Sequence, residues 1–294
     1  MSNKIMITAA LTGAVTPKEL NDSIPLTPEE IAEDAYQCWK AGASIVHLHM
    51  RDEAGKGSMD AARFRKTIEL LRAYEDCDVV ICCTSSGTYP PVGSAERMAH
   101  FKSIPEIEMG SYDAGTFNWG CDVVFDNTPQ FLTELGMCYQ EYDVKAELEI
   151  FDMGMLGNVK HYLKKGVLQT PPYCQFVLGV LGGMEASVEN LQYLVRHMPE
   201  GSIWSAFGIG KDHMPIMYAA LALGANGIRV GLEDCVMYSK GVKATNVMLV
   251  ERAVRVVEAF GKAVATPAEA RKILGIKQLI RQTALEEHSE IGGI

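Results

Sequence analysis

Short apolar segments alternate with amphipathic segments along almost the whole chain. The apolar runs predict buried strands, because each is short and ends in polar or glycine-rich residues. The expected strands are 5–11, 44–50, 79–84, 106–111, 147–151, 175–179, 203–208 and 227–231. Helical patterns lie between most of them, for example after Thr27-Pro28-Glu29-Glu30, where threonine can cap a helix and proline can take its first turn.

This alternation predicts the fold. Eight strands with intervening helices in 294 residues indicate an α/β fold of the (β/α)8 or TIM-barrel type, built as a single domain. A doubly wound sheet is less favoured, because no GxGxxG motif follows the first strand and no linker precedes a second domain. Segment 267–294 is expected to form a C-terminal helical extension, packed outside the barrel or against a partner subunit.

Composition narrows the class of protein. The net charge of -10 argues against a general role in binding nucleic acid or membrane surfaces. No apolar run reaches the ~18 residues of a membrane span, and the N-terminus has no signal-peptide pattern, so a cytoplasmic location is expected. Eight scattered cysteines without a CxxC motif fit reduced core thiols.

Two histidines stand at the end of the second predicted strand, in His47-Leu48-His49. Residues two apart in a strand point to the same face, so the two imidazoles could bind one transition metal, and this placement suits zinc. Two hydrogen-bonded structural histidines would give the same pattern. The pair alone therefore leaves both interpretations open.

The barrel prediction brings acidic residues to the same rim. Active sites in such barrels form at the C-terminal ends of the strands, and Glu233 and Asp234 follow the eighth strand, which also contains Arg229. A carboxylate there could complete a site of two histidines and one carboxylate. Arg229 and the two acids could instead form a solvated salt-bridge cluster. Together with the histidine pair, the functional interpretation is favoured.

Other strand ends add polar groups. The turn Thr84-Ser85-Ser86-Gly87 can offer hydroxyl and backbone N–H groups to a carboxylate or carbonyl, although its composition is also that of an ordinary turn. Ser111 closes the fourth predicted strand. In the fifth, Glu149 lies nearer the active end than Glu147, which can be a structural ion-pair partner. Lys211, after the seventh strand, can meet a phosphate of a cofactor or can simply be solvated.

Several motifs occur in order over essentially the whole chain. They are Ile7-Thr8-Ala9-Ala10-Leu11-Thr12-Gly13-Ala14, Ala41-Gly42-Ala43 before His47-Leu48-His49-Met50-Arg51, Phe176-Val177-Leu178-Gly179-Val180 with Gly182-Gly183-Met184, and Arg229-Val230-Gly231-Leu232-Glu233-Asp234. Together they resemble the β-keto acid cleavage enzyme family. The resemblance implies a zinc-dependent barrel, usually a homotetramer, that converts a β-keto acid and acetyl-CoA into acetoacetate and a shorter acyl-CoA.

The resemblance also implies roles for individual residues. The family's zinc ligands fall on His47, His49 and Glu233, and its deprotonating arginine and aspartate fall on Arg229 and Asp234. We hypothesise that Asp234, held by Arg229, helps to generate an enolate that attacks the thioester of acetyl-CoA. A retro-Claisen step would follow, with zinc polarising the keto group.

The rest of the rim differs slightly from the family pattern. Hydroxyl groups of the family correspond to Thr84 and Ser111, and its fifth-strand glutamate corresponds to Glu149. The family's Ser-Thr-Gly-Gly turn has Ser86 at its third position here, which makes a close approach of ligand to that backbone less certain.

One departure bears on the substrate. Where the family's 3-keto-5-aminohexanoate-cleaving member has an acid after Gly-Ala, this chain has Val15. Losing a negative charge weakens a pocket's preference for a cation, so we predict a β-keto acid whose distal end is neutral or anionic. Another acid, such as Glu149, could supply the charge instead.

Other classes of function fit less well. A metal-dependent hydrolase of the amidohydrolase type also combines HxH with an acid after the eighth strand. It normally has further histidines at the fifth and sixth strand ends, which this chain lacks. A Schiff-base aldolase would need a lysine within a strand, whereas Lys211 follows one. A catalytically silent acyl-CoA-binding barrel remains an alternative that turnover with acetyl-CoA would distinguish.

Overall fold

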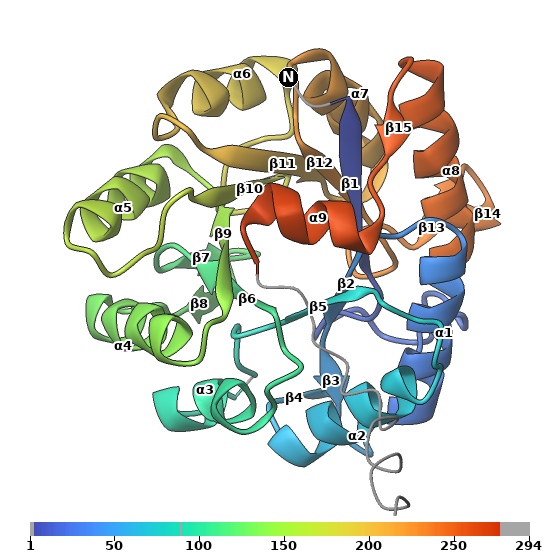
Figure 1. The fold of residues 1–294 in the computed structure, drawn as a ribbon, viewed down its shortest axis with the longest axis horizontal. Coiled ribbons are helices and arrows are strands. Elements are labelled where there is room, and N and C mark those ends of the chain that lie inside the picture. The colour runs from blue at the N-terminus through green and yellow to red at the C-terminus, as the bar shows by residue number, and fades with distance from the viewer. Residues whose placement is uncertain (1–2, 89, 277–294) are drawn as a thin grey trace, which may run out of the picture.

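A computed structural model describes residues 3–88 and 90–276 of the chain. Eight parallel strands form a barrel, and the last pairs with the first through the register of Met6 with Gly227, so the sheet is closed (Figure 1). In barrel order the strands are β1 Lys4–Ala10, β2 Ile45–Leu48, β5 Val80–Cys83, β6 Met109–Asp113, β9 Lys145–Ile150, β10 Tyr173–Leu178, β11 Ile203–Gly208 and β12 Gly227–Val230. The prediction of a TIM barrel is confirmed.

Helices surround the barrel. In chain order they are α1 Pro28–Lys40, α2 Ala61–Arg72, α3 Ser94–Ser103, α4 Pro129–Glu141, α5 Met153–Lys164, α6 Val188–His197, α7 His213–Ala222, α8 Asn246–Ala259 and α9 Pro267–Leu274. The first helix begins as its sequence predicts, because Thr27 accepts a hydrogen bond from the N–H of Glu30 and the Glu30 carboxylate accepts one from the N–H of Thr27. Within the described residues, none of these helices is long and apolar enough to cross a bilayer.

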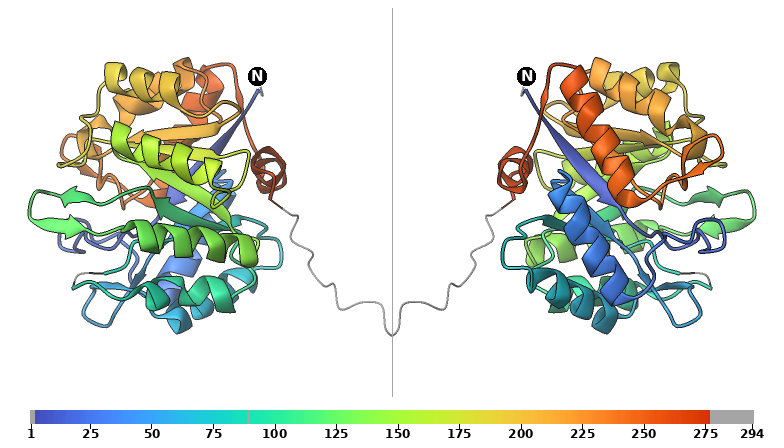
Figure 2. Two further views of the ribbon diagram at one scale, coloured as in Figure 1. Left: turned by 90° about the vertical axis from the view of Figure 1, so that its left-hand side faces the viewer. Right: turned by 90° about the vertical axis from the view of Figure 1, so that its right-hand side faces the viewer.

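Short elements extend the loops after several barrel strands. Three are two-stranded antiparallel hairpins, and a single turn of 3-10 helix, η1, follows β11. They are β3 Met50–Arg51 with β4 Gly57–Ser58, β7 Phe117–Trp119 with β8 Val123–Phe125, β13 Met237–Ser239 with β14 Val242–Lys243, and η1 Gly210–Asp212. The hairpin β7–β8 and helix α9 lie at opposite ends of the barrel (Figure 2).

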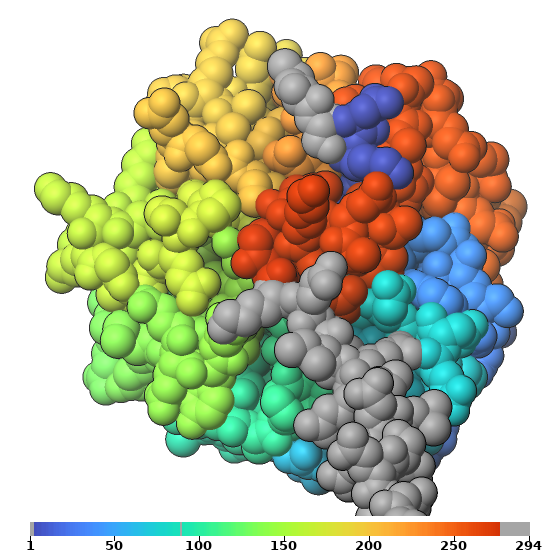
Figure 3. Space-filling model, viewed as in Figure 1, coloured from blue at the N-terminus to red at the C-terminus, as the bar shows by residue number. Residues whose placement is uncertain are grey.

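The N-terminal end of the barrel is closed by an apolar layer and by α9. Strand β15, Ala263–Val264, pairs with the start of β1 and leads the chain into α9. Ala270 and Leu274 of α9 pack against Met6, Tyr173 and other buried side chains in the barrel floor. In the space-filling view α9 lies over the middle of this face (Figure 3). The functional site must therefore open at the other end.

Three expectations need correction or restriction. The strand expected at 106–111 is β6, Met109–Asp113, because residues 105–106 form a turn after α3 in which the N–H of Ile107 donates to Ile104. The expected C-terminal helical extension is observed as α9, whereas residues 277–294 lie outside the described residues. Seven of the cysteines are buried and form no disulfide, as expected, but Cys121 is exposed.

Candidate active site

A cavity of about 850 Å³ opens at the C-terminal end of the barrel. Most of the predicted site residues line it, although they come from six of the eight barrel strands or the loops that follow them. These residues are Val15, His47, His49, Thr84, Ser86, Gly87, Ser111, Glu149, Arg229, Glu233 and Asp234. The fold thus assembles one site from residues that are distant in sequence.

The two histidines face the same carboxylate. Both are buried, their ring centroids are 5.1 Å apart, and Nε2 of His49 lies 3.3 Å from Oε1 of Glu233. The corresponding distance from Nε2 of His47 is 3.8 Å. Burial would lower the pKa of His47, but Glu233 and Glu147 together outweigh it and the pKa is raised. For His49 burial prevails and lowers the pKa.

Glu233 reaches this position because the chain turns back sharply after β12. Gly231 has a φ of 148°, and a Cβ atom there would lie 1.9 Å from the carbonyl oxygen of Ala10. The N–H of Glu233 then donates to the same carbonyl over 3.2 Å. A glycine is therefore required where the loop crosses β1, and it holds the Glu233 backbone against that strand.

Arg229 lies at the centre of the acidic residues. Its Nε donates to Asp234 over 2.8 Å, one terminal nitrogen donates to Glu149 over 2.9 Å, and the other donates to Glu233 over 2.8 Å. The guanidinium also stacks over the Phe207 ring at 4.3 Å. These contacts exclude a solvated salt-bridge cluster, because the side chain is buried and every contact lies inside the barrel mouth.

Two of the carboxylates around Arg229 differ in pKa. Burial would raise the pKa of Glu233, but His49 and Arg229 outweigh it and lower that pKa well below its usual range. Burial raises the pKa of Asp234 to about 6 despite the opposing effect of Arg229. Glu233 is thus ionised at neutral pH, whereas Asp234 titrates close to it, which suits an acid-base group.

The residues present fit a divalent cation. His47, His49 and Glu233 each offer a ligand atom, and these atoms lie within 4.8 Å of one another. The second oxygen of Glu233, Oε2, is buried and has no hydrogen-bond partner. An orphaned carboxylate oxygen beside two imidazoles is a donor set that zinc accepts, with room for a further ligand in the cavity.

Asp113 is a site residue that sequence reasoning missed. It is buried in the cavity wall at the end of β6, opposite Glu149 in the register with β9. Burial and the nearby Glu149 raise the pKa of Asp113 well above its usual range, which favours the protonated form, a hydrogen-bond donor. Period-2 spacing from Ser111 would have indicated it, had the strand been extended by two residues.

The hydroxyl-rich turn after β5 divides into two parts. Thr84 and Ser86 line the cavity and are joined by a 2.8 Å hydrogen bond between their hydroxyl groups. Ser85 is not among the described residues that line it: its hydroxyl donates to the carbonyl of Ser111, and its N–H donates to the Ser111 hydroxyl. Ser85 therefore fixes the turn to β6 and leaves its neighbours to face a ligand.

Two further predicted residues lie farther from the chemistry. Val15 lies at the cavity mouth and is 66% exposed. Its loop is held by Arg51, whose guanidinium donates to the carbonyls of Gly13 and Thr16. Lys211 is exposed on η1 and does not line the described cavity, so any contact with a cofactor would be made outside it.

Comparisons with known proteins agree with this site. A family model described as beta-keto acid cleavage enzyme matches residues 4–276. The chain is 42% identical to a 3-keto-5-aminohexanoate cleavage enzyme of Fusobacterium nucleatum, over 95% of this chain and 100% of that protein. It is 34% identical to a 3-dehydrocarnitine:acetyl-CoA trimethylamine transferase of Rhizobium meliloti, over 93% of this chain and 97% of that protein.

Among solved structures, the apo structure of ObcA has a similar fold. Its TM-score is 0.78 at 20% identity, and the match covers 86% of this chain and 66% of that one. At this identity the likeness supports the barrel alone.

The barrel and its polar rim define an enzyme of the α/β-barrel type. The chain belongs to the beta-keto acid cleavage enzyme family, which confirms the predicted resemblance. The names of the relatives confirm the predicted acyltransferase class as well. The amidohydrolase alternative has no structural support, because His47 and His49 are the only histidines among the described residues that line the cavity.

Proposed function

We propose that the protein condenses a β-keto acid with acetyl-CoA and releases acetoacetate and a shorter acyl-CoA. The observation that carries this proposal is the arrangement around Arg229. This side chain holds Asp234, an acid-base group with a pKa of about 6, beside a histidine pair and an ionised glutamate. Relatives named as acetyl-CoA-dependent transferases support the reaction class.

We propose zinc as the metal, held by His47, His49 and Glu233. Support comes from the donor set of two imidazoles and one carboxylate and from the orphaned oxygen of Glu233. When bound, the ion would supply Lewis-acid polarisation of the keto group and compensate charge that develops on its oxygen.

Asp234 is the proposed base. It would take the proton from the substrate carbon between the carboxylate and the ketone, and that carbon would then attack the thioester carbonyl of acetyl-CoA and release the CoA thiolate. Attack of the thiolate on the substrate's keto carbon would break the bond between these two substrate carbons, giving the shorter acyl-CoA and an acetoacetate carbanion that Asp234 protonates. Arg229 binds both oxygens of Asp234, over 2.8 and 2.9 Å, and so keeps the carboxylate oriented while it accepts and returns the proton. Because the raised pKa of about 6 leaves the group ionised at pH 7, it is ready to act as a base.

Neighbouring groups would orient the substrate. Glu149 accepts a 2.9 Å hydrogen bond from Arg229 and completes the support of that side chain. The Thr84 and Ser86 hydroxyls, the Gly87 turn and Ser111 face the same cavity, where they can donate to the substrate carboxylate or carbonyl. We assign these four residues to substrate binding.

The distal end of the substrate is proposed to be neutral or anionic. Val15 lies where the distal end would emerge at the cavity mouth, in a loop fixed by Arg51. Apolar side chains dominate the wall formed by β7–β8 and the loop after β10, including Trp119, Phe125 and Leu181. A panel of β-keto acids assayed for acetoacetate release tests this, and strict preference for an amino-substituted acid would refute it.

Acetyl-CoA and subunit assembly extend beyond the cavity. We propose that Lys211 meets a phosphate of CoA outside the cavity, since it is an exposed cation on η1, directly after the lining residue Ile209. We also propose a homotetramer, which exposed aromatic side chains on α7 and after α8 support: Tyr218 and Phe260 are stacked with ring centroids 6.3 Å apart. Sedimentation analysis would measure the assembly.

The decisive experiment measures metal content and acetyl-CoA-dependent turnover in wild type and His49→Ala. We expect the variant to lose zinc and turnover together, because two of three ligands would remain. His197→Ala is the matched control, since that half-buried histidine on α6 contacts Tyr193 and does not line the described cavity. A His49→Ala protein with full zinc and full activity would overturn the proposal, and turnover without acetyl-CoA would indicate a hydrolase.

A further inference from the structure

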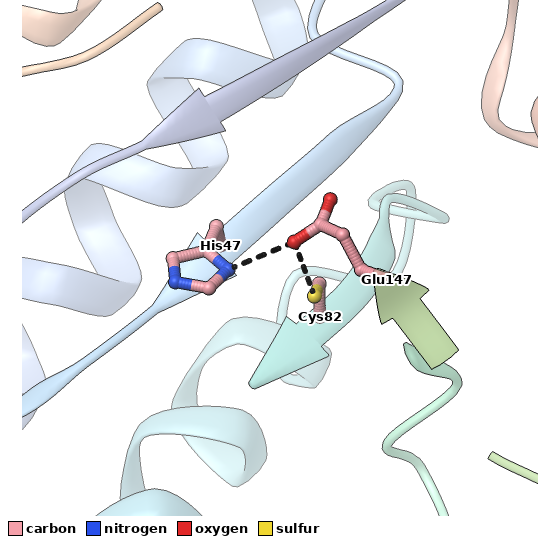
Figure 4. Close-up of side chains that lie close together, drawn as sticks. All are labelled: His47, Cys82 and Glu147. Atoms are coloured by element: carbon pink, nitrogen blue, oxygen red, sulfur yellow. Dashed lines mark hydrogen bonds and ion pairs between the residues drawn. The ribbon is translucent and has the colours of Figure 1, made fainter. Parts of the chain in front are cut away.

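A second carboxylate lies beneath the proposed metal site, inside the barrel. Glu147, on β9, is fully buried, and its Oε2 atom lies 3.4 Å from Nδ1 of His47 (Figure 4). It does not line the described part of the cavity, so it can reach neither substrate nor solvent there. Its contacts with side chains of other strands across the barrel interior must therefore account for it.

A thiol from β5, the strand beside β2, approaches the same oxygen. Sγ of Cys82, on β5, donates to Oε2 of Glu147 over 3.4 Å (Figure 4). Burial raises the pKa of the Cys82 thiol well above its usual range, so the thiol keeps its proton and can act only as a donor to the carboxylate. Two groups from two strands thus converge on one carboxylate oxygen.

His47 faces a different carboxylate on each side of its ring. Nε2 is directed toward Glu233 in the cavity, and Nδ1 toward Glu147 in the barrel interior. A neutral imidazole carries one N–H, and a nitrogen needs a free lone pair to bind a metal. A carboxylate acceptor at Nδ1 would place the hydrogen there and leave Nε2 free.

We propose that Glu147 is a positioning residue for the metal site: it accepts the Nδ1–H of His47, fixes the ring and its tautomer, and is itself held by Cys82. The proposal rests on the proposed function, since it concerns how His47 binds zinc. A carboxylate behind a metal-bound histidine raises the basicity of the ligand nitrogen, and removing such a partner typically lowers metal affinity about 10- to 100-fold.

The same three groups could hold a metal of their own, because His47, Cys82 and Glu147 offer ligand atoms within 4.8 Å of one another. We favour the positioning role for two reasons. Neither Cys82 nor Glu147 lines the described cavity, so the cluster has no open side for an additional ligand. The protonated thiol would also have to lose its proton to become a metal ligand.

The test is the zinc affinity of Glu147→Gln, measured by competition with a chelator on the full chain. We expect affinity to fall at least tenfold, roughly the lower limit for loss of such a partner. Asp34→Asn is the matched control, because it makes the same acid-to-amide change at a half-buried carboxylate that accepts from Asn246 and does not line the described cavity. A folded Glu147→Gln protein with wild-type affinity would overturn the inference.

A second readout separates positioning from a merely structural role. In zinc-loaded protein labelled with ¹⁵N-histidine, the Nδ1 proton of His47 should resonate downfield in the wild type and move upfield in Glu147→Gln. If that variant does not fold, Cys82→Ala should still shift the same resonance, while Cys174→Ala, which removes another buried thiol, should not. An unchanged resonance in Cys82→Ala would count against the proposal.

Metal stoichiometry distinguishes the remaining outcomes. One zinc per chain in wild type and in Cys82→Ala supports the positioning role. Two per chain in wild type and one in Cys82→Ala would show that the cluster binds a metal itself and would overturn the inference. Wild-type protein that binds no zinc would overturn the proposed metal and this inference together, whereas unchanged affinity in Glu147→Gln overturns the inference alone.

Discussion

A cluster of buried charged side chains lies at each end of the barrel, and the two clusters have opposite ratios of cations to acids. At the N-terminal end Glu108 accepts hydrogen bonds from Arg271 of α9 and from Arg72 of α2. At the C-terminal end Arg229 alone donates to three carboxylates. The cluster around Glu108 therefore has two cations for one acid, and the cluster around Arg229 has one cation for three acids.

The excess cations of one cluster and the excess acids of the other have different surroundings. At the N-terminal end, terminal nitrogens of the two guanidiniums also donate to backbone carbonyls, those of Asp78 and Val79, and α9 covers the cluster. At the C-terminal end, Oε2 of Glu233 has no hydrogen-bond partner, and Glu233 lines the cavity. The comparison indicates that buried charge stabilises the closed end, whereas at the open end it leaves a demand for a cation and for substrate.

The largest expected effect comes from breaking the charge balance at the open end. Arg229→Met should lower kcat/KM for acetoacetate formation by about a thousandfold or more, because Asp234 and Glu233 would lose their shared donor and repel each other. Arg255→Met is the control, since this exposed arginine of α8 bonds Tyr238 away from the cavity. A decrease of less than tenfold in Arg229→Met would contradict the central role of Arg229.

Breaking the closed end should affect stability and leave chemistry unchanged. Arg271→Met would leave Glu108 with the 3.5 Å contact to Arg72 and the 3.4 Å hydrogen bond from the Ile81 N–H. Losing one partner of a buried pair costs about 3 to 5 kcal/mol. Urea unfolding measures this cost. Lys4→Met removes the half-exposed ion pair between Lys4 and Glu269 on the same helix and should cost at most about 1 kcal/mol. A stable Arg271→Met protein with impaired kcat/KM would show that the two ends are coupled.

The contrast also explains what the sequence could and could not predict. The barrel and the His47, His49, Arg229 and Glu233 set followed from local patterns: apolar runs, an HxH spacing and a charged end to the last strand. Barrel geometry then made distant strand ends neighbours. These predictions needed only which strand a residue ends, and a shift of one or two residues in strand boundaries did not harm them.

Other residues depended on register and on partners far along the chain. Asp113 was missed because the predicted strand stopped at Ser111, two residues early. Ser85 was expected to face a ligand, but it lies between two cavity-lining neighbours and bonds to β6 instead. The contact of Glu147 with His47 joins residues 100 positions apart on strands that are not adjacent in the barrel, so no local pattern could reveal it.

A buried histidine near the open end predicts acid sensitivity. His100, on α3, bonds the Thr84 carbonyl through Nε2, and burial lowers its pKa to about 3. Because an unfolded histidine titrates near 6.5, this contribution is complete above pH 6.5 and is lost as pH falls toward 3, amounting to about 2 kcal/mol at pH 5. Urea unfolding at pH 7 and pH 5 should therefore show that His100→Gln loses about 2 kcal/mol less unfolding free energy than the wild type between these two pH values.

The control for that experiment is His161→Gln, which removes an exposed histidine of α5. It should lose the same stability between pH 7 and pH 5 as the wild type. An equal loss in wild type and His100→Gln would mean that groups other than His100 dominate the acid response. The carboxylates at the open end would then be the groups to test.

The smallest expected effect concerns the edge of the open end, where charge is exposed and screened. Val15→Glu should raise the ratio of kcat/KM for an amino-substituted over a neutral β-keto acid by about tenfold, equivalent to about 1.4 kcal/mol, because it adds a negative charge at the mouth. Val188→Glu adds the same charge at an exposed position of α6 that does not line the described cavity, and it should leave the ratio unchanged. Equal ratios in all three proteins would show that the distal end of the substrate does not lie near Val15.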